Sequence, residues 1–209
     1  LILGSEHRYG VAANGGIVHG SSNTIAAANA ASIGGGGNQA TGLGSVVVGG
    51  NVNSATAQFS SVFAGTQNIA LAPNAAVVGG ILNQAAATNS LICGGAQNIT
   101  SAEYSAIAGG RWNNTYGGGG EPGGFIGGGT YNNTSSRYAT AVGGFGNSAS
   151  GFNATTVGGM SNSASGELSC VSGGRQNNAS GGYSVVGGGS VRSATGTDDW
   201  TAGGLWQDQ

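Results

Sequence analysis

The sequence predicts an all-β fold: a parallel β-solenoid (β-roll) of about 14 stacked coils of fifteen residues, the last one incomplete. Three observations predict it: an asparagine that recurs at a fixed interval, two neighbouring glycines before it, and small or branched apolar residues in between. A short fixed period is typical of repeat architectures. Fifteen residues are too few for a pair of helices, but they suffice for two short strands and two turns.

The recurring asparagine defines slot 0 of each coil. Slot-0 residues are fifteen apart, with one interval of nineteen, and they are Asn23, Asn38, Asn53, Asn68, Asn83, Asn98, Asn113, Asn132, Asn147, Asn162 and Asn177. The extended frame places Arg8 before them and Arg192 and Gln207 after them. Stacked amides hydrogen-bond to each other and to turn backbone, so we interpret the row as a structural ladder. An exposed ligand-binding row is the alternative.

Glycines and apolar residues fill the other slots regularly. Slots −4 and −3 are glycine in nearly every coil, with Ser5 in slot −3 of the first, and they indicate a tight corner. Slot −6 is Val or Ile in most coils, including Ile17 and Val47, and slot −8 is small. We therefore expect slots −8, −6 and −4 to face the interior. Alanine recurs in slot +2 of the second strand, which lets the two strands of a coil lie close together.

Slot −5 should point outward, yet it is also apolar. It holds Leu3, Val18, Ile33, Val48, Phe63, Val78, Val142 and Val157. A strand that is apolar on both faces is covered on both faces, and one thin coil covers only the inner one. We therefore expect the outer face to pack against neighbouring chains. A homotrimer is the simplest closed arrangement.

Composition and charge exclude several function classes. The chain has 46 glycines, 6% charged residues and a formal net charge of −2, and its five basic residues are scattered, so nucleic-acid binding is not expected. No apolar run is long enough to cross a membrane. His7 and His19 occupy different slots without neighbouring ligands, so we expect no metal, no cofactor and no enzyme activity. Because the chain begins with Leu1, we expect a fragment or a processed form.

The two cysteines occupy apolar strand slots. Cys93 and Cys170 are five coils apart in the frame, roughly 24 Å at the usual strand spacing, which is too far for a disulfide. We expect both thiols to be buried.

The repeat resembles the head repeat of trimeric autotransporter adhesins (YadA-like heads), and similar repeats occur in phage tail fibres. That family repeats a Ser-x-Val/Ala-x-Gly strand, a short turn and then Ala-x-Gly. The likeness is carried here by the segments Ser45–Gly49, Ser105–Gly109, Ser169–Gly181 and Ser184–Gly188. The doubled glycine and the Asn slot depart from that family's pattern. The resemblance implies a left-handed parallel β-roll, three chains per fibre and attachment to surfaces or receptors, with no catalytic residue.

Departures from the repeat are candidate sites, because insertions in repeat proteins map to loops on one face. Residues 1–197 form the array, with an inserted loop at 116–124, and 198–209 form a C-terminal cap or tip. Large side chains gather near the insertion and at the end of the chain. Candidate receptor-binding residues are Tyr104, Arg111, Trp112, Tyr131, Arg137, Tyr138, Phe145, Trp200 and Trp206. Shielding of the axis and packing between chains are the alternatives for them.

We expect an extracellular attachment fibre, on a virion or a bacterial cell surface, that binds a cell-surface glycan or protein receptor. An ice-binding solenoid is one alternative, although only Thr100, Thr115 and Thr134 share a slot in consecutive coils. A polysaccharide-degrading tailspike is another. It would need paired carboxylates, but Glu103, Glu121 and Glu167 lie on different coils.

Overall fold

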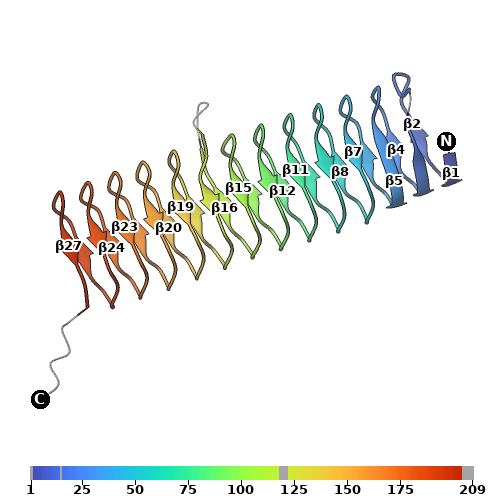
Figure 1. Cartoon of the computed structure of the whole chain (residues 1–209). Coiled ribbons are helices and arrows are strands. Elements are labelled where there is room, and N and C mark those ends of the chain that lie inside the picture. Colours follow the sequence, from blue (N-terminus) through green and yellow to red (C-terminus); the bar gives the residue numbers. More distant parts are fainter. Residues whose placement is uncertain (1, 15, 118–121, 204–209) are drawn as a thin grey trace, which may run out of the picture. The chain divides into compact units, whose positions relative to one another are not determined.

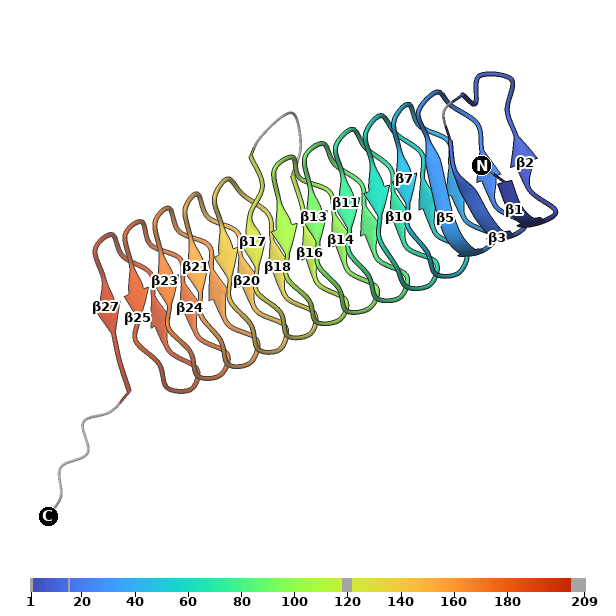
Figure 2. The ribbon, with the colours of Figure 1, turned by 45° about the vertical axis from the view of Figure 1, so that its right-hand side comes forward.

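The computed structural model describes residues 2–14, 16–117 and 122–203. They form an all-β parallel solenoid of about 13 turns without a helix, which confirms the predicted β-solenoid (Figure 1). The chain divides into two compact units, Leu1–Gly110 (unit 1) and Arg111–Gln209 (unit 2). Each turn contributes one strand to each of two parallel sheets (Figure 2).

In unit 1 the odd-numbered strands form sheet A and the even-numbered strands form sheet B. Sheet A contains β1 (Ile2–Ser5), β3 (Val18–Ser21), β5 (Ala31–Gly36), β7 (Val46–Val47), β9 (Ser61–Val62), β11 (Ala76–Val77), β13 (Leu91–Ile92) and β15 (Ala106–Ile107). Sheet B contains β2 (Arg8–Tyr9), β4 (Thr24–Ile25), β6 (Gln39–Ala40), β8 (Ser54–Ala55), β10 (Ile69–Ala70), β12 (Gln84–Ala85) and β14 (Ile99–Thr100).

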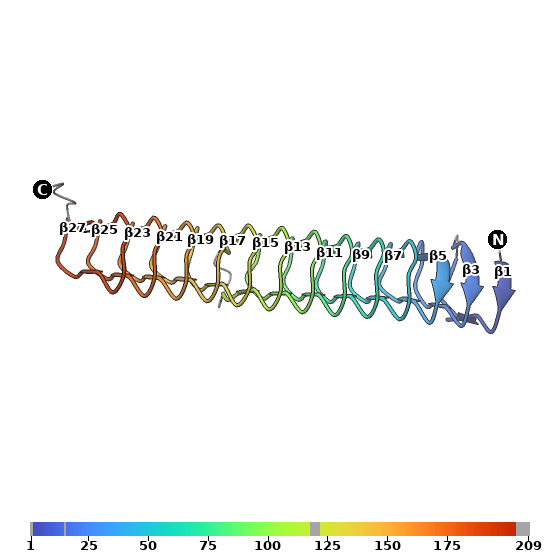
Figure 3. The ribbon, with the colours of Figure 1, turned by 90° about the horizontal axis from the view of Figure 1, so that it is seen from below.

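Unit 2 repeats this arrangement. Its odd-numbered strands are β17 (Phe125–Ile126), β19 (Thr140–Ala141), β21 (Thr155–Thr156), β23 (Cys170–Val171), β25 (Val185–Val186) and β27 (Trp200–Thr201). Its even-numbered strands are β16 (Asn114–Thr115), β18 (Asn133–Thr134), β20 (Ser148–Ala149), β22 (Ser163–Ala164), β24 (Asn178–Ala179) and β26 (Ser193–Ala194). Strands from neighbouring turns pair in parallel (Figure 3).

The register follows the predicted fifteen-residue period in most coils. Val77 pairs with Ile92 in sheet A, and Ala70 pairs with Ala85 in sheet B. In unit 2, Thr115 pairs with Thr134, nineteen residues later, whereas Phe125 pairs with Thr140, fifteen residues later. The four extra residues therefore fall between β16 and β17, in the stretch 116–124, of which 118–121 lie outside the described residues.

The core is one thin layer between the two sheets. Slot −6 (Val77, Ile92), slot +2 (Ala70, Ala85) and slot 0 are fully buried, as is the small slot −8. Slot −4 does not face this core as expected, because the chain has already begun its corner there, and Ala64 in that slot is exposed. Alanine in slot +2 opposite Val or Ile in slot −6 matches the thin interior, since two large facing side chains would push the sheets apart.

The first coil departs from the predicted frame. Arg8 pairs with Thr24, sixteen residues later, so this coil is one residue longer than predicted and His7 occupies slot 0 instead of Arg8. Slot −3 then holds Gly4 rather than Ser5, and the apparent exception in the glycine row disappears.

A second irregularity lies in β5. Val18 pairs with Ser32, but Ser21 pairs with Gly36, so β5 carries one extra residue as a bulge in a glycine-rich stretch. The shift buries Val18, which is 1% exposed, and leaves Ile17 44% exposed, the reverse of the expectation from the frame.

Slot −3 is where glycine is required. Gly95 has φ of 86°, and a Cβ added there would clash with the carbonyl of Gly110 in the next coil. Gly94 in slot −4 has nothing within 4 Å of such a Cβ. Of the two neighbouring glycines in each coil, the one in slot −3 is therefore required by the backbone geometry, and the one in slot −4 is not.

Candidate binding site

The slot-0 asparagines hydrogen-bond to backbone on both sides. Asn83 Nδ2 donates to Gly79 O in its own corner and to Gly95 O in the next, both at 2.9 Å. Asn83 Oδ1 accepts the Asn98 N–H at 3.0 Å. The same set recurs along the row, and the side chains are buried. Since the side-chain amides are buried and hydrogen-bonded to backbone groups, this row presents no ligand-binding surface.

His7 and Arg192 extend the row at its two ends. His7 Nδ1 accepts the Asn23 N–H at 3.4 Å, and its Nε2 lies 3.2 Å from Leu3 O, an arrangement that fits a proton on Nε2. The backbone N–H of Arg192 donates to Asn177 Oδ1 at 2.9 Å, so Arg192 takes slot 0 as the frame predicts. Gln207 lies outside the described residues.

The outer face of sheet A is apolar and accessible. Slot −5 side chains are exposed along it, with Phe63 at 49% and Val78 at 44%. Slots −7 and −5 hold no charged residue from β7 to β15 or, in unit 2, from β17 to β27. Cys93 (slot −5) is exposed and Cys170 (slot −7) is half-buried, so the expectation of two buried thiols is wrong. Both thiols point away from the thin core.

Unit 2 carries a row of large side chains at the corner that joins sheet A to sheet B. We call it the corner strip; it contains Arg111, Trp112, Tyr131, Phe145, Met160 and Arg175. Backbone bridges link Arg111, Thr130, Phe145, Met160 and Arg175 in successive coils, so slot −2 side chains lie one strand spacing apart. Phe145 and Tyr131 are each 49% exposed, and both arginines are exposed.

The corner strip is held together by ring contacts. The Arg111 guanidinium carbon lies 3.6 Å from the Trp112 ring centroid, and the Trp112 and Tyr131 rings stack at 4.7 Å. Phe145 meets Tyr131 edge-on at 5.6 Å. Trp112 and Tyr131 have positive φ values of 53° and 57°, at a cost of about 1 kcal/mol each. Ring stacking and the cation–π contact stabilise the folded chain by about the same amount as this backbone strain costs. The net effect of the strip on folding stability is therefore close to zero.

The sequence-predicted candidates separate into different places. Arg111, Trp112, Tyr131 and Phe145 come together in the corner strip, which also contains Met160 and Arg175. Sequence reasoning missed those two, although they share slot −2 with Arg111 and Phe145. Arg137 and Tyr138 lie at the opposite corner of their coil, between β18 and β19, where Tyr138 contacts Phe152 edge-on at 6.0 Å.

The remaining candidates do not belong to that strip. Tyr104 belongs to unit 1 and occupies the same kind of opposite corner, in an exposed position with φ of 56°. Trp200 is exposed in β27, and Trp206 lies outside the described residues. The structure therefore gives these residues no common site.

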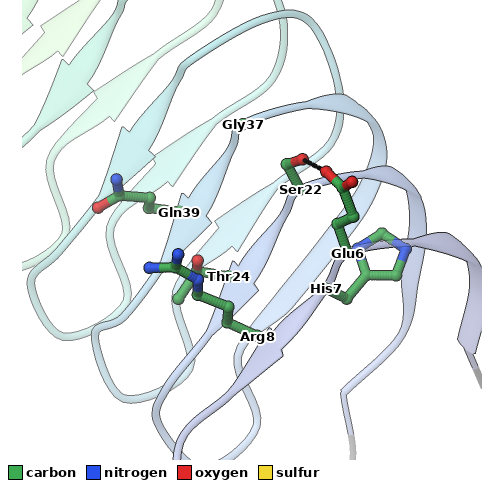
Figure 4. Close-up of a pocket in the computed structure, with 7 residues that line it drawn as sticks. All are labelled: Glu6, His7, Arg8, Ser22, Thr24, Gly37 and Gln39. Atoms are coloured by element: carbon green, nitrogen blue, oxygen red, sulfur yellow. Dashed lines mark hydrogen bonds between the residues drawn. The ribbon is translucent and has the colours of Figure 1, made fainter.

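The described part of unit 1 contains shallow hollows. One, of about 620 Å³, is lined by Glu6, His7, Arg8, Ser22, Thr24, Gly37 and Gln39 (Figure 4). There the Ser22 hydroxyl donates to the Glu6 carboxylate at 2.9 Å. Another, of about 290 Å³, lies on sheet B among Val52, Ile69 and Leu82. Across the described ranges, no group of three His, Cys, Asp or Glu side chains could hold a metal, and no helix is long and apolar enough to span a membrane.

Comparison with known proteins gives no family for this chain. No protein-family model matches it. A search of curated proteins finds no significant match either. Its function is therefore inferred from the surfaces described above.

Proposed function

We propose that this protein is a structural attachment fibre in which three chains associate through the outer face of sheet A. It acts outside the cell, on a virion or a bacterial surface, and binds a cell-surface glycan or protein receptor. One observation supports this most directly: slot −5 of sheet A is exposed, apolar and uncharged over many consecutive coils. Contiguous exposed apolar patches of this kind mark interaction sites.

The energetics are of the right size for self-association. Half-exposed side chains such as Val48, Phe63 and Val78 would each contribute about 1 kcal/mol when an interface covers the rest of their surface. A row of them along each chain can offset an association cost of about 4–15 kcal/mol. Because slot −5 is apolar in the successive coils from Val48 to Ala108, similar contacts recur along that part of the chain.

Three chains and left-handed winding are proposed from the adhesin-like repeat. Three-fold symmetry places one apolar face of every chain toward a common axis and closes the assembly. Sheet B then faces outward. Its outward slots +1 and +3 are mostly Ser, Asn, Gln and Thr in the described coils, which suits a surface that stays in water.

The alternatives lose support on particular residues. Thr100, Thr115 and Thr134 are fully buried, so they cannot form a face that contacts ice. For a tailspike, Glu103 is half-buried in unit 1 and Glu167 is exposed in unit 2, while Glu121 lies outside the described residues. Glycoside hydrolysis needs two neighbouring carboxylates. Among the described residues, no second Asp or Glu occupies a slot next to Glu103 in unit 1 or next to Glu167 in unit 2. The structure therefore adds no observation in favour of hydrolysis.

A matched pair of substitutions tests the proposed interface. Val78 is 44% exposed one residue after a sheet A strand, and Leu71 is 43% exposed one residue after a sheet B strand. We expect Val78→Glu to dissociate the trimer, because it places three charges in an apolar interface, and Leu71→Glu to leave the trimer intact. Sedimentation velocity measures the mass of each.

The native thiol of Cys93 gives a second readout. It lies in slot −5 and is exposed in the single chain, so assembly should slow its reaction with a maleimide. Val78→Glu should restore fast labelling, whereas Leu71→Glu should not. A wild-type protein that sediments as a monomer, with Cys93 labelled at the rate of a free thiol, contradicts the proposal.

A further inference from the structure

We infer that the corner strip of unit 2 binds an acidic linear polysaccharide. This inference rests on the proposed attachment function and specifies the class of surface ligand for it. The strip is exposed and elongated, and it combines large apolar side chains with two arginines. Arg111 and Arg175 are separated by four strand spacings, roughly 19 Å. A polymer that carries a carboxylate on every unit can meet both guanidinium groups without a fixed register.

Charge complementarity supports an anionic ligand. In the described coils of unit 2, slots −2 and −1 contain Arg111 and Arg175 but no Asp or Glu. The described acidic residues of this unit, Glu167, Asp198 and Asp199, all lie at the opposite corner, between a sheet B strand and the following sheet A strand. The strip therefore attracts anions, even though the chain as a whole has a net charge of −2.

The contact between Arg111 and Trp112 leaves the guanidinium able to bind a carboxylate. The guanidinium carbon lies over the ring, 3.6 Å from its centroid, so the ring covers one side of the group. The N–H donors point outward in the guanidinium plane and can form a bidentate pair with a carboxylate. Stacking on the ring also holds the side chain in place, which lowers the entropy lost on binding.

The ring geometry favours a sugar over a nucleic-acid base. Arg111 and Tyr131 both lie against the Trp112 ring, and they cannot share one face at 3.6 and 4.7 Å, so they cover opposite faces. Trp112 therefore has no free face on which a base could stack. The accessible apolar surface between the two arginines is that of Tyr131, Phe145 and Met160, which can contact the C–H faces of sugar rings.

The backbone of the strip does not explain its large residues. Slot −1 is positive-φ backbone, and Ser161 and Gly146 occupy it in neighbouring coils. Slot −2 is Thr130 in the coil between Arg111 and Phe145. Small residues therefore satisfy the same positions, and substitutions to serine in slot −1 or to threonine in slot −2 should leave the fold intact.

Affinity electrophoresis in gels that contain polygalacturonate tests the inference, with dextran as the neutral polymer. We expect polygalacturonate to retard the wild-type chain, and added salt to weaken this binding. Arg111→Gln with Arg175→Gln should lower the affinity by about tenfold or more, and Tyr131→Ser and Phe145→Thr should each lower it measurably. Arg8→Gln is the matched control for Arg111→Gln alone, because each removes one charge, and it should change the affinity by less than about twofold.

Four results would overturn the inference. The first two are no retardation of the wild-type chain by polygalacturonate and equal retardation by dextran. The third is an equal loss of affinity in Arg8→Gln and in the strip variants. The fourth is full competition by inorganic polyphosphate at equal charge, which would show that the strip recognises charge alone. Sedimentation of the same samples separates the two proposals. A trimer that does not bind polygalacturonate contradicts only the proposed polysaccharide ligand. A monomer that binds polygalacturonate contradicts only the proposed trimeric fibre.

Discussion

Gly95→Ala is expected to destabilise the protein by about 4 kcal/mol or more, which is the range of severe single substitutions. Gly95 has φ of 86°, a region that L-residues with a side chain rarely adopt. Its added Cβ would also meet backbone of the next coil, with Gly110 N at 2.8 Å and Gly110 O closer still. That carbonyl already accepts hydrogen bonds from Ala96 N and Asn98 Nδ2, so moving it away weakens both.

Gly94→Ala is the matched control for this prediction. Gly94 is the neighbouring glycine, and nothing lies within 4 Å of a Cβ added there. We expect its stability to change by less than about 1 kcal/mol, because the substitution meets open space. Urea denaturation of both variants, with the midpoint and the slope fitted, measures the difference. Equal midpoints for the two variants would contradict the assignment of slot −3 as the required glycine.

The period in the sequence predicts most of the fold because each coil must repeat the same corner. A buried Asn, a positive-φ glycine and an inward Val or Ile leave a fifteen-residue signal at Asn68, Gly65 and Val62 that recurs in coil after coil. The signal fails in the first coils, as far as β5, for a physical reason. A bulge in β5 and an extra residue before β3 shift the register, and glycine-rich backbone accommodates both without a distinctive side chain.

The candidate site was harder to predict, because exposure depends on which corner a residue occupies. Trp112 and Tyr131 stack since they fill the same slot in adjacent coils, and this follows from the frame. Arg175 shares a slot with Arg111, but it has no aromatic neighbour in sequence to draw attention to it. Tyr138, close to Tyr131 in the chain, lies at the opposite corner because β18 intervenes.

The sequence also did not predict that bulky residues adopt positive φ values. Most coils place slots −9 and −1 in the left-handed region, and residues as different as Asn74, Val52 and Tyr183 occupy them. Stacking of successive coils imposes this conformation through backbone hydrogen bonds such as Asn74 N to Gln58 O. Propensity at a single position cannot reveal a conformation that the neighbouring coils enforce.

Asn83→Ala is expected to cost about 3–5 kcal/mol, because it removes four buried or part-buried side-chain hydrogen bonds at once. The Asn98 N–H loses its acceptor, Asn83 Oδ1, and Gly79 O loses the Asn83 Nδ2 donor. Gly95 O is affected less, since it keeps the bond from Ile81 N at 2.9 Å. The orphaned N–H lies inside the corner, and no water can replace its partner unless the coil opens.

The effect should be local at first, because each coil contacts only its neighbours in a solenoid. Hydrogen exchange measured by mass spectrometry should show faster exchange at Asn98 and its neighbours in the coils around β12 and β14 than in coils far from the substitution. Gln84→Ser is the control: it changes the next residue, whose side chain points outward, to the serine found at the same slot in β8. We expect that control to stay within about 0.5 kcal/mol of the wild type. Uniform protection across the coils in Asn83→Ala, with unchanged stability, would show that the asparagine row does not hold the corners together.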